Sequence, residues 1–374
     1  GDDPTIVGQL AAAFIRGAKS FPVLTSAKHF PGHGDTATDS HLELPVIPHD
    51  RERLEQIELP PFKAAIAAGV DTVMSAHLHI PALDADAPAT LSNPILTGLL
   101  RQDLGFDGLI TTDALVMGAI ANRYGVDEAA ILAVEAGADI LLMPEDPVRT
   151  IQAVCTAVEK GRIAPERIQA SVDRIRWAKQ GIGAPHQAGA DATTHAWENV
   201  SPPPVQLEHL AQPQVRETAI AILNDSMECH IPTPLPSVSA GHNMVLIDNS
   251  LDSDFLGLTS AAVTVPKARG YSTLTLIDQH SSIDTPFVTA SPLPTLLQLF
   301  VRGNPFRGSA GLSDRATTLL TTLLQRKCLK AIVVYGSPYL WETLKPQLPA
   351  ELPCIFTYGQ MPMAQTLAME ALFD

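Results

Sequence analysis

The residue types best suited to chemistry gather in one stretch, 28–41, which glycine and proline break into a loop. It contains three histidines, two aspartates and a lysine: Lys28, His29, His33, Asp35, Asp39 and His41. Asp39 and His41 are two positions apart, so in an extended chain both side chains lie on one side. A carboxylate beside an imidazole fixes the tautomer of the ring and stabilises its charged form, as a proton shuttle requires. The stretch therefore predicts an acid/base site.

The same stretch allows a second interpretation, a metal site, because its histidines and aspartates are all possible ligands. Their spacing matches neither the His-Glu-x-x-His pattern nor the paired cysteines of standard zinc sites. Any one of these residues alone could be an ordinary solvated loop residue. Six of them within 14 residues favour a reactive site, and we expect no metal and no cofactor.

A second reactive candidate is Asp113, which ends the apolar run 108–112 and is followed by more apolar residues. An ionised carboxylate in such a place is costly unless it has partners. The alternative explanation is that Asp113 caps the N-terminus of a helix. The residues by themselves leave both explanations open.

These segments resemble a known family. Lys-His-Phe-Pro-Gly-His-Gly-Asp-Thr at 28–36, with Asp-Ser-His at 39–41, is similar to the signature of the bacterial β-N-acetylglucosaminidases of glycoside hydrolase family 3. The resemblance implies that His41 is the acid/base, that Asp39 orients it, and that Lys28 and His29 bind sugar hydroxyls. The segment 113–120 resembles the nucleophile strand of the same family, which implies that Asp113 is the nucleophile.

Residues 74–77 match a further strand of that family, and the match implies that His77 lines the sugar pocket. The alternative for His77 is an ordinary histidine at a strand end with hydrogen-bond partners inside the protein. The remaining histidines, His49 among them, stand apart from any cluster in the sequence.

The elements that must position these residues alternate regularly. Strand-like runs at 23–27, 72–76, 109–112 and 140–143 precede helical patterns at 54–68, 94–104, 127–136 and 148–179. Strands that alternate with helices predict a parallel sheet. The candidate residues fall at or just past the ends of these runs: Lys28 and His29 at the first, His77 at the second and Asp113 at the third. In (β/α)₈ barrels this edge of the sheet carries the chemistry.

Four such units are half of the eight that a barrel needs. The family resemblance implies that residues 1–182 are the C-terminal half of a (β/α)₈ TIM-type barrel, units five to eight, with the first four units upstream of Gly1. A linker rich in Ala, Pro, Thr and Gln is expected at 183–214. Strand-like runs at 219–223, 244–247, 273–277, 297–301, 331–335 and 355–358, with helical stretches at 319–327 and 363–372, predict a smaller α/β sandwich domain at 215–374.

Composition excludes several classes of function. The net charge of −15 argues against nucleic acid and anionic membrane surfaces as partners. No apolar run approaches the length of about 20 residues that a membrane-spanning helix needs. The four cysteines are scattered, which predicts a reduced compartment, and we expect a cytoplasmic location. A targeting signal upstream of Gly1 is neither visible nor excluded.

The combined prediction is a retaining glycoside hydrolase that removes terminal β-linked N-acetylglucosamine. The resemblance implies a glycan or cell-wall muropeptide that contains this sugar as the partner. Two alternatives stay open. An acid/base that is not a carboxylate repels phosphate less, so the enzyme could be a phosphorylase. A chain with half a barrel could also bind glycans without catalysis.

Overall fold

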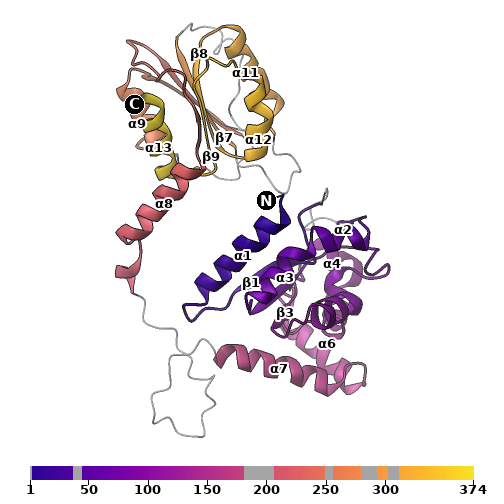
Figure 1. Cartoon of the computed structure of the whole chain (residues 1–374). Helices are drawn as coiled ribbons and strands as arrows, with labels where there is room; N and C mark the ends of the chain where they lie inside the picture. The colour runs from indigo at the N-terminus through magenta and orange to yellow at the C-terminus, as the bar shows by residue number, and fades with distance from the viewer. Residues whose placement is uncertain are drawn as a thin grey trace. The chain divides into compact units, whose positions relative to one another are not determined.

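The computed structural model describes residues 2–36, 44–180, 206–248, 256–278, 281, 293–301 and 311–374. The chain divides into two compact units, Gly1–Val205 and Gln206–Asp374, and both are drawn in Figure 1. The division falls inside the stretch predicted as a linker. Residues 183–205 of that stretch lie outside the described part, whereas 206–214 contain the short helix η4 (Leu207–His209) and the start of α8.

The first unit contains a parallel sheet, as predicted. Its strands are β1 (Ser26–Phe30), β2 (Thr72–Ser75) and β3 (Leu109–Thr111), and β2 lies in the middle. Strand β1 begins three residues later than the predicted run, so Lys28 and His29 lie within the strand rather than after it. The run predicted at 140–143 is not a strand, since it forms only one bridge, between Thr111 and Ile140.

The helices of the first unit are α1 (Pro4–Ala18), α2 (Arg51–Gln56), α3 (Leu59–Ala67), the π-helical η2 (Pro94–Asp103), α4 (Gly118–Tyr124), α5 (Val126–Ala136), α6 (Pro147–Glu159) and α7 (Pro165–Gln180), with a short turn η1 (Ala89–Leu91). The patterns at 54–68 and 148–179 each correspond to two helices instead of one. Prolines cause these breaks, because Pro60 and Pro165 are tolerated only in the first turn of a helix. Helix α4 was not predicted.

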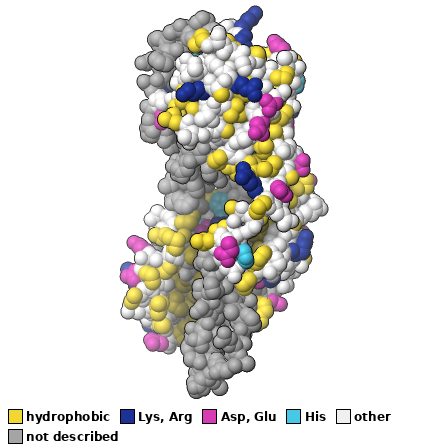
Figure 2. Space-filling view, turned by 90° about the vertical axis from the view of Figure 1, so that its left-hand side faces the viewer, with side chains coloured by type: hydrophobic (Ala, Val, Ile, Leu, Met, Phe, Trp, Pro, Cys, Tyr) yellow, Lys and Arg dark blue, Asp and Glu magenta, His cyan; other side chains and the backbone are white. Residues whose placement is uncertain are grey.

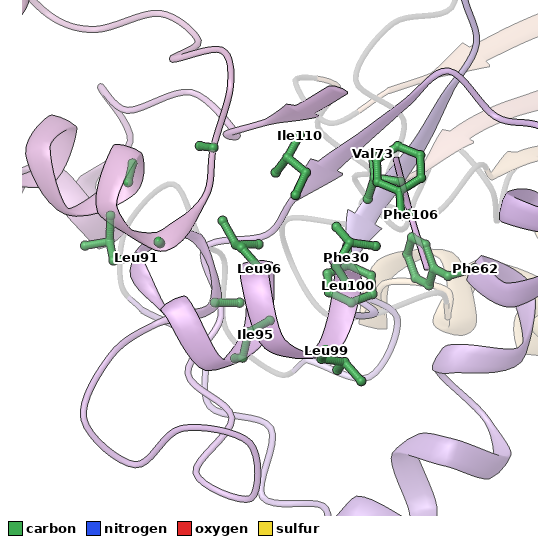
Figure 3. Packing of buried hydrophobic residues seen from close by; sticks show 14 of the residues in the cluster. Phe30, Phe62, Val73, Leu91, Ile95, Leu96, Leu99, Leu100, Phe106 and Ile110 are labelled. Carbon is green, nitrogen blue, oxygen red and sulfur yellow. The ribbon is translucent and has the colours of Figure 1, made fainter. Parts of the chain in front are cut away.

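One face of the three-stranded sheet packs on helices. Phe30, Val73 and Ile110, one from each strand, are fully buried. Figure 3 shows them gathered with the leucines of η2 and with Phe62 of α3. The rings of Phe30 and Phe62 meet edge to face, with centroids 5.1 Å apart. Phe30, the last residue of β1, belongs to this core and directly follows His29, so the core fixes the position of the strand end that carries His29.

The second unit is a three-layer sandwich. Its strands are β4 (Glu228–His230), β5 (His242–Asp248), β6 (Thr273–Ile277), β7 (Thr295–Val301), β8 (Leu329–Gly336) and β9 (Cys354–Thr357), in the order β4-β9-β8-β7-β5-β6. All neighbours are parallel except β4 and β9. Helices α9 (Ala261–Ala268) and α13 (Pro362–Phe373) cover one face of the sheet (Figure 1). Helices α11 (Asp314–Gln325) and α12 (Pro338–Leu344), with the short η5 (Lys345–Gln347), lie on the other side of the sheet.

Five of the six strand-like runs in this unit are strands, but the prediction at 219–223 is wrong. These residues belong to helix α8 (Pro213–Ser226). A short apolar run cannot be assigned to strand or helix by periodicity alone, and here the flanking residues extend it into a helix of 14 residues. Among the described residues, no helix combines the length and the apolar character that crossing a membrane requires.

Candidate active site

The predicted site residues His29, His77 and Asp113 come together at the carboxyl edge of the first sheet. Nε2 of His29, on β1, lies 3.8 Å from Oδ2 of Asp113, which follows β3. His77 follows β2, the strand between them, and its Nε2 lies 3.0 Å from the carbonyl oxygen of Ala114, the residue after Asp113. The residues that the sequence placed at the ends of three separate runs therefore lie at one edge, as parallel strands require.

The two carboxylate oxygens of Asp113 have different neighbours among the described residues. Oδ1 accepts a hydrogen bond from the Ala114 amide at 2.8 Å. Oδ2 has the His29 ring at 3.8 Å, which is beyond hydrogen-bond length. Asp113 is not a helix cap, because α4 begins at Gly118 with Met117 at the N-cap position. The side chain is 18% exposed, so ligands can reach it.

His29 is half-buried among charged neighbours. Burial lowers its pKa, Asp113 opposes this by raising it, and Lys28 and His33 lower the pKa further. The net effect is a lowered pKa, so His29 is neutral at neutral pH. A neutral imidazole has one donor and one acceptor nitrogen and can bind hydroxyl groups in either direction. The ring of His33 packs against that of His29 edge to face, with centroids 5.9 Å apart, whereas the side chain of Lys28 is exposed.

His77 differs from the position that the family resemblance implied. Its side chain is fully buried. Its Nδ1 lies 2.9 Å from Thr90 Oγ1, and its Nε2 lies 3.0 Å from the carbonyl oxygen of Ala114. Both ring nitrogens therefore have protein partners, and the ring is not open to a sugar hydroxyl in this structure. This geometry agrees with the alternative explanation for His77, an ordinary histidine with hydrogen-bond partners inside the protein.

Asp39 and His41, the predicted acid/base pair, lie outside the described residues. The chain that leads to them is described as far as Thr36, and its Asp35 contacts His49 and Arg53, of which Arg53 belongs to α2. Oδ2 of Asp35 lies 2.8 Å from His49 Nε2 and 3.8 Å from Arg53 Nη2. Arg53 Nη1 in turn donates to both oxygens of the buried Glu58 at 2.8 Å.

The chain beyond Glu43 is bound to His79, which lies in the loop after β2. Residue Val46 forms a parallel bridge with His79. The Ile47 amide donates to the His79 carbonyl, and the His79 amide donates to the Pro45 carbonyl, both at 2.9 Å. The described residues that flank the segment 37–43 are thus hydrogen-bonded to other parts of the first unit.

The pairing of His49 with Asp35 could not be predicted from the sequence. His49 lies 14 positions from Asp35 in a stretch without periodicity, and only the fold brings the two together. Within the described residues, no three His, Cys, Asp or Glu side chains converge in an arrangement that could hold a metal ion.

Comparison with known proteins places both units in one family. Residues 1–177 match the glycosyl hydrolase family 3 N terminal domain, and residues 235–374 match the bacterial glycosyl hydrolase family 3 C-terminal domain. Beta-hexosaminidase A of Pseudoalteromonas piscicida is 37% identical over 195 residues, which are 46% of this chain and 33% of the relative. A beta-hexosaminidase of Tolumonas auensis is 43% identical over 141 residues, which are 37% of this chain and 42% of the relative.

The similarity extends to solved structures. A glycoside hydrolase family 3 beta-N-acetylglucosaminidase from Paenibacillus sp. str. FPU-7 superposes with a TM-score of 0.73 at 29% identity, over 98% of this chain and 68% of that one. The chain spans between a third and a half of the length of the two curated relatives named above. Two domain matches to one family, in the expected order and over most of the sequence, assign this chain to glycoside hydrolase family 3.

Proposed function

We propose that this chain supplies the nucleophile and the acid/base of a retaining β-N-acetylglucosaminidase. The observation that carries the proposal is the approach of His29 to Oδ2 of Asp113 at 3.8 Å, while the other oxygen, Oδ1, is bound to the Ala114 amide. Relatives named beta-hexosaminidase and a solved beta-N-acetylglucosaminidase of the family support the choice of reaction and sugar.

In the proposed first step, Oδ2 of Asp113 attacks the anomeric carbon of the sugar. The bond from that carbon to the leaving oxygen breaks, and His41, oriented by Asp39, donates a proton to the departing group. In the second step His41 takes a proton from water, and the water oxygen displaces Asp113 from the glycosyl-enzyme. Two successive inversions give retention at the anomeric carbon.

The residues around Asp113 have separate roles in this proposal. The Ala114 amide binds Oδ1 and so leaves Oδ2 for the attack. His29, neutral at neutral pH, and Lys28 bind hydroxyl groups of the sugar and hold its anomeric carbon near Oδ2. Such positioning supplies a large part of the rate of an enzyme.

We also propose that the first unit is half of a (β/α)₈ barrel. Three parallel strands with helices between them, and the bridge at Ile140, support this arrangement. Helix α1 buries Gly8, Ala12 and Ile15 but exposes a second apolar stripe, formed by Ile6, Leu10 and Phe14. A stripe of this kind fits packing against a neighbouring βα unit. Apolar side chains also reach the surface on the face drawn in Figure 2.

We further propose that cell-wall muropeptides are the natural substrate and that the protein is located in the cytoplasm. The substrate follows from the family resemblance of the segment 28–41, and the location follows from the four scattered cysteines. A faster turnover of N-acetylglucosaminyl muropeptides than of chitobiose would support the first, and fractionation of cells with an antibody against the protein would test the second.

The test uses the full-length natural protein and an aryl β-N-acetylglucosaminide. The variant Asp113→Asn should reduce kcat by about 10⁴-fold or more, because it removes the nucleophile and changes little volume. Binding of N-acetylglucosamine, measured by calorimetry, should change little. Asp86→Asn, which alters an exposed carboxylate, is the matched control and should have normal activity. An Asp113→Asn enzyme with a tenth of normal activity would overturn the assignment.

Two further measurements separate the alternatives. A rate that does not depend on phosphate concentration would identify a hydrolase rather than a phosphorylase. Sugar binding without any turnover in the full-length protein would identify a glycan-binding protein. Trapping with a fluorinated, activated glycoside, followed by peptide mass analysis, should label Asp113.

A further inference from the structure

A buried chain of hydrogen bonds leads from the segment 84–92 to the residue beside Asp113. The carboxylate of Asp84 closes this segment, since Oδ2 accepts from Ser92 Oγ at 2.6 Å and Oδ1 accepts from the Asp86 and Ala87 amides at 2.9 and 3.2 Å. The segment carries Thr90, which is fully buried. Its position is therefore set by a loop that is bound to itself.

Thr90 links this loop to the end of β2. Its Oγ1 lies 2.9 Å from three different atoms: Ser75 Oγ, the Ala76 carbonyl oxygen and His77 Nδ1. Ser75, His77 and Thr90 have no exposed surface, so bulk water does not compete for these bonds. Hydrogen bonds are strengthened in such surroundings, and the loss of one partner leaves a buried polar atom unpaired.

His77 continues the chain to the residue after Asp113. A carbonyl oxygen only accepts hydrogen bonds, so His77 Nε2 carries a proton and donates it to the Ala114 carbonyl at 3.0 Å. The amide of the same Ala114 donates to Asp113 Oδ1 at 2.8 Å. Ala114 is thus held at its carbonyl by His77, while its amide holds the carboxylate.

We infer that His77, fixed by Thr90, is a positioning residue for Asp113. It keeps Ala114 in place, so that the Ala114 amide binds Oδ1 and Oδ2 stays directed to the side of His29. This role rests on the proposed function of Asp113 as the nucleophile. A shift of about 1 Å in a reacting group can reduce the rate about 100-fold, so a bond two residues away from substrate is sufficient to affect kcat.

The first test removes the Thr90 hydroxyl by Thr90→Val. The matched control is Thr150→Val on α6, because Thr150 is also buried in the first unit but its hydroxyl has no hydrogen-bond partner among the described residues. Thr90→Val should reduce kcat and the rate of glycosyl-enzyme formation by about 10- to 100-fold. KM should change by less than about threefold, since Thr90 and His77 have no exposed surface with which to contact the sugar. Thr150→Val should behave as the wild type.

The second test compares His77→Gln with His77→Leu. The amide of glutamine can donate to the Ala114 carbonyl as Nε2 does, whereas leucine cannot. The kcat of His77→Gln should therefore be at least about tenfold higher than that of His77→Leu, although the two variants should have equal melting temperatures. This pair also replaces the first test if Thr90→Val does not fold. In ¹⁵N-histidine NMR of the wild type, a downfield and slowly exchanging Hε2 signal of His77 is expected, and it should weaken in Thr90→Val.

The outcomes distinguish the positioning role from the proposed function. If the wild type turns over substrate and Thr90→Val equals Thr150→Val, or His77→Leu equals His77→Gln, the positioning role is overturned and the function stands. A large rise in KM with normal kcat in the His77 variants would show sugar binding instead and would also overturn it. No turnover in the wild type would overturn both.

Discussion

His29 and Asp113 approach to 3.8 Å although His29 lies in β1 and Asp113 follows β3, with β2 between these two strands. The contact is possible because Asp113 lies beyond the end of β3 at Thr111 and is not part of the strand. It lies at the carboxyl edge, where the chains of all three strands turn away from the sheet. His29 is therefore sensitive to any change in the surroundings of the proposed nucleophile.

The protonation of His29 should make folding stability depend on pH. Burial lowers the pKa of His29 below its ordinary value of about 6.5. The unfolded chain then binds this proton more tightly than the folded one. The stabilising contribution is complete above pH 6.5 or so and is lost as the pH falls through the lowered pKa. Burial lowers the pKa of His242 in the second unit in the same direction.

Calorimetric melting between about pH 7 and pH 5 tests this expectation. The melting temperature should fall gradually below pH 6.5 or so, and His29→Gln should reduce the slope. His209→Gln is the control, because His209 is exposed and should leave the slope unchanged. An identical slope in His29→Gln and the wild type would contradict the expectation.

Two glycines of the stretch 28–36 should respond very differently to alanine. Gly32 has φ of +137°, and a Cβ atom there would lie 2.7 Å from Cβ and Cγ of the buried Glu58. Gly34 has nothing within 4 Å of its Cβ position. We expect Gly32→Ala to reduce the free energy of unfolding by roughly 1–3 kcal/mol and Gly34→Ala to change it little. Denaturant titration of both variants would measure the difference, and equal losses would contradict the described path of this segment.

The buried carboxylate of Asp139 should be a major contributor to the stability of the first unit. It has no exposed surface and accepts from Arg101 Nη2 at 2.5 Å, Ser171 Oγ at 2.6 Å and the Ile110 amide at 2.9 Å. Burial lowers the pKa of Arg101 to about 10, and Asp139 opposes that shift. Without Asp139, the buried guanidinium loses its nearest counter-charge. Asp139→Asn should therefore cost about 3–5 kcal/mol of unfolding free energy.

The matched control for this prediction is Asp127→Asn. Asp127 forms two hydrogen bonds with Arg149, at 2.8 and 2.9 Å, but both side chains are exposed. Exposed ion pairs contribute little, because water and salt screen them. Urea unfolding should show a large decrease for Asp139→Asn and almost none for Asp127→Asn. Equal decreases would mean that burial does not determine the contribution of these pairs.

The proposed acid/base role of His41 predicts a dependence on the leaving group. His41→Ala should slow natural disaccharides, whose leaving groups need protonation, by about 10²–10⁴-fold. Activated aryl glycosides, which need little protonation, should be affected much less. Asp39→Ala should act in the same direction but more mildly. His209→Ala serves as the control, and equal losses on both types of substrate would mean that His41 has a structural role.

Some features of this protein are determined by short-range sequence patterns. Of the ten apolar runs of four or five residues that predicted strands, three are parallel strands of the first unit and five are strands of the second. The position of Asp113 at the end of one run and of His77 at the end of another already implied a shared edge. These predictions succeed because the periodicity of side chains and the breaks at proline and glycine are local properties.

Tertiary structure decided the rest, because it depends on residues far apart in the chain. The pairing of Asp35 with His49, and the burial of His77 against Thr90, join loops that carry no pattern. The sequence determined which side chains are available at the sheet edge. Packing then determined that His29 reaches Asp113 whereas His77 is turned into the protein, since only the closed core sets which nitrogen meets which oxygen.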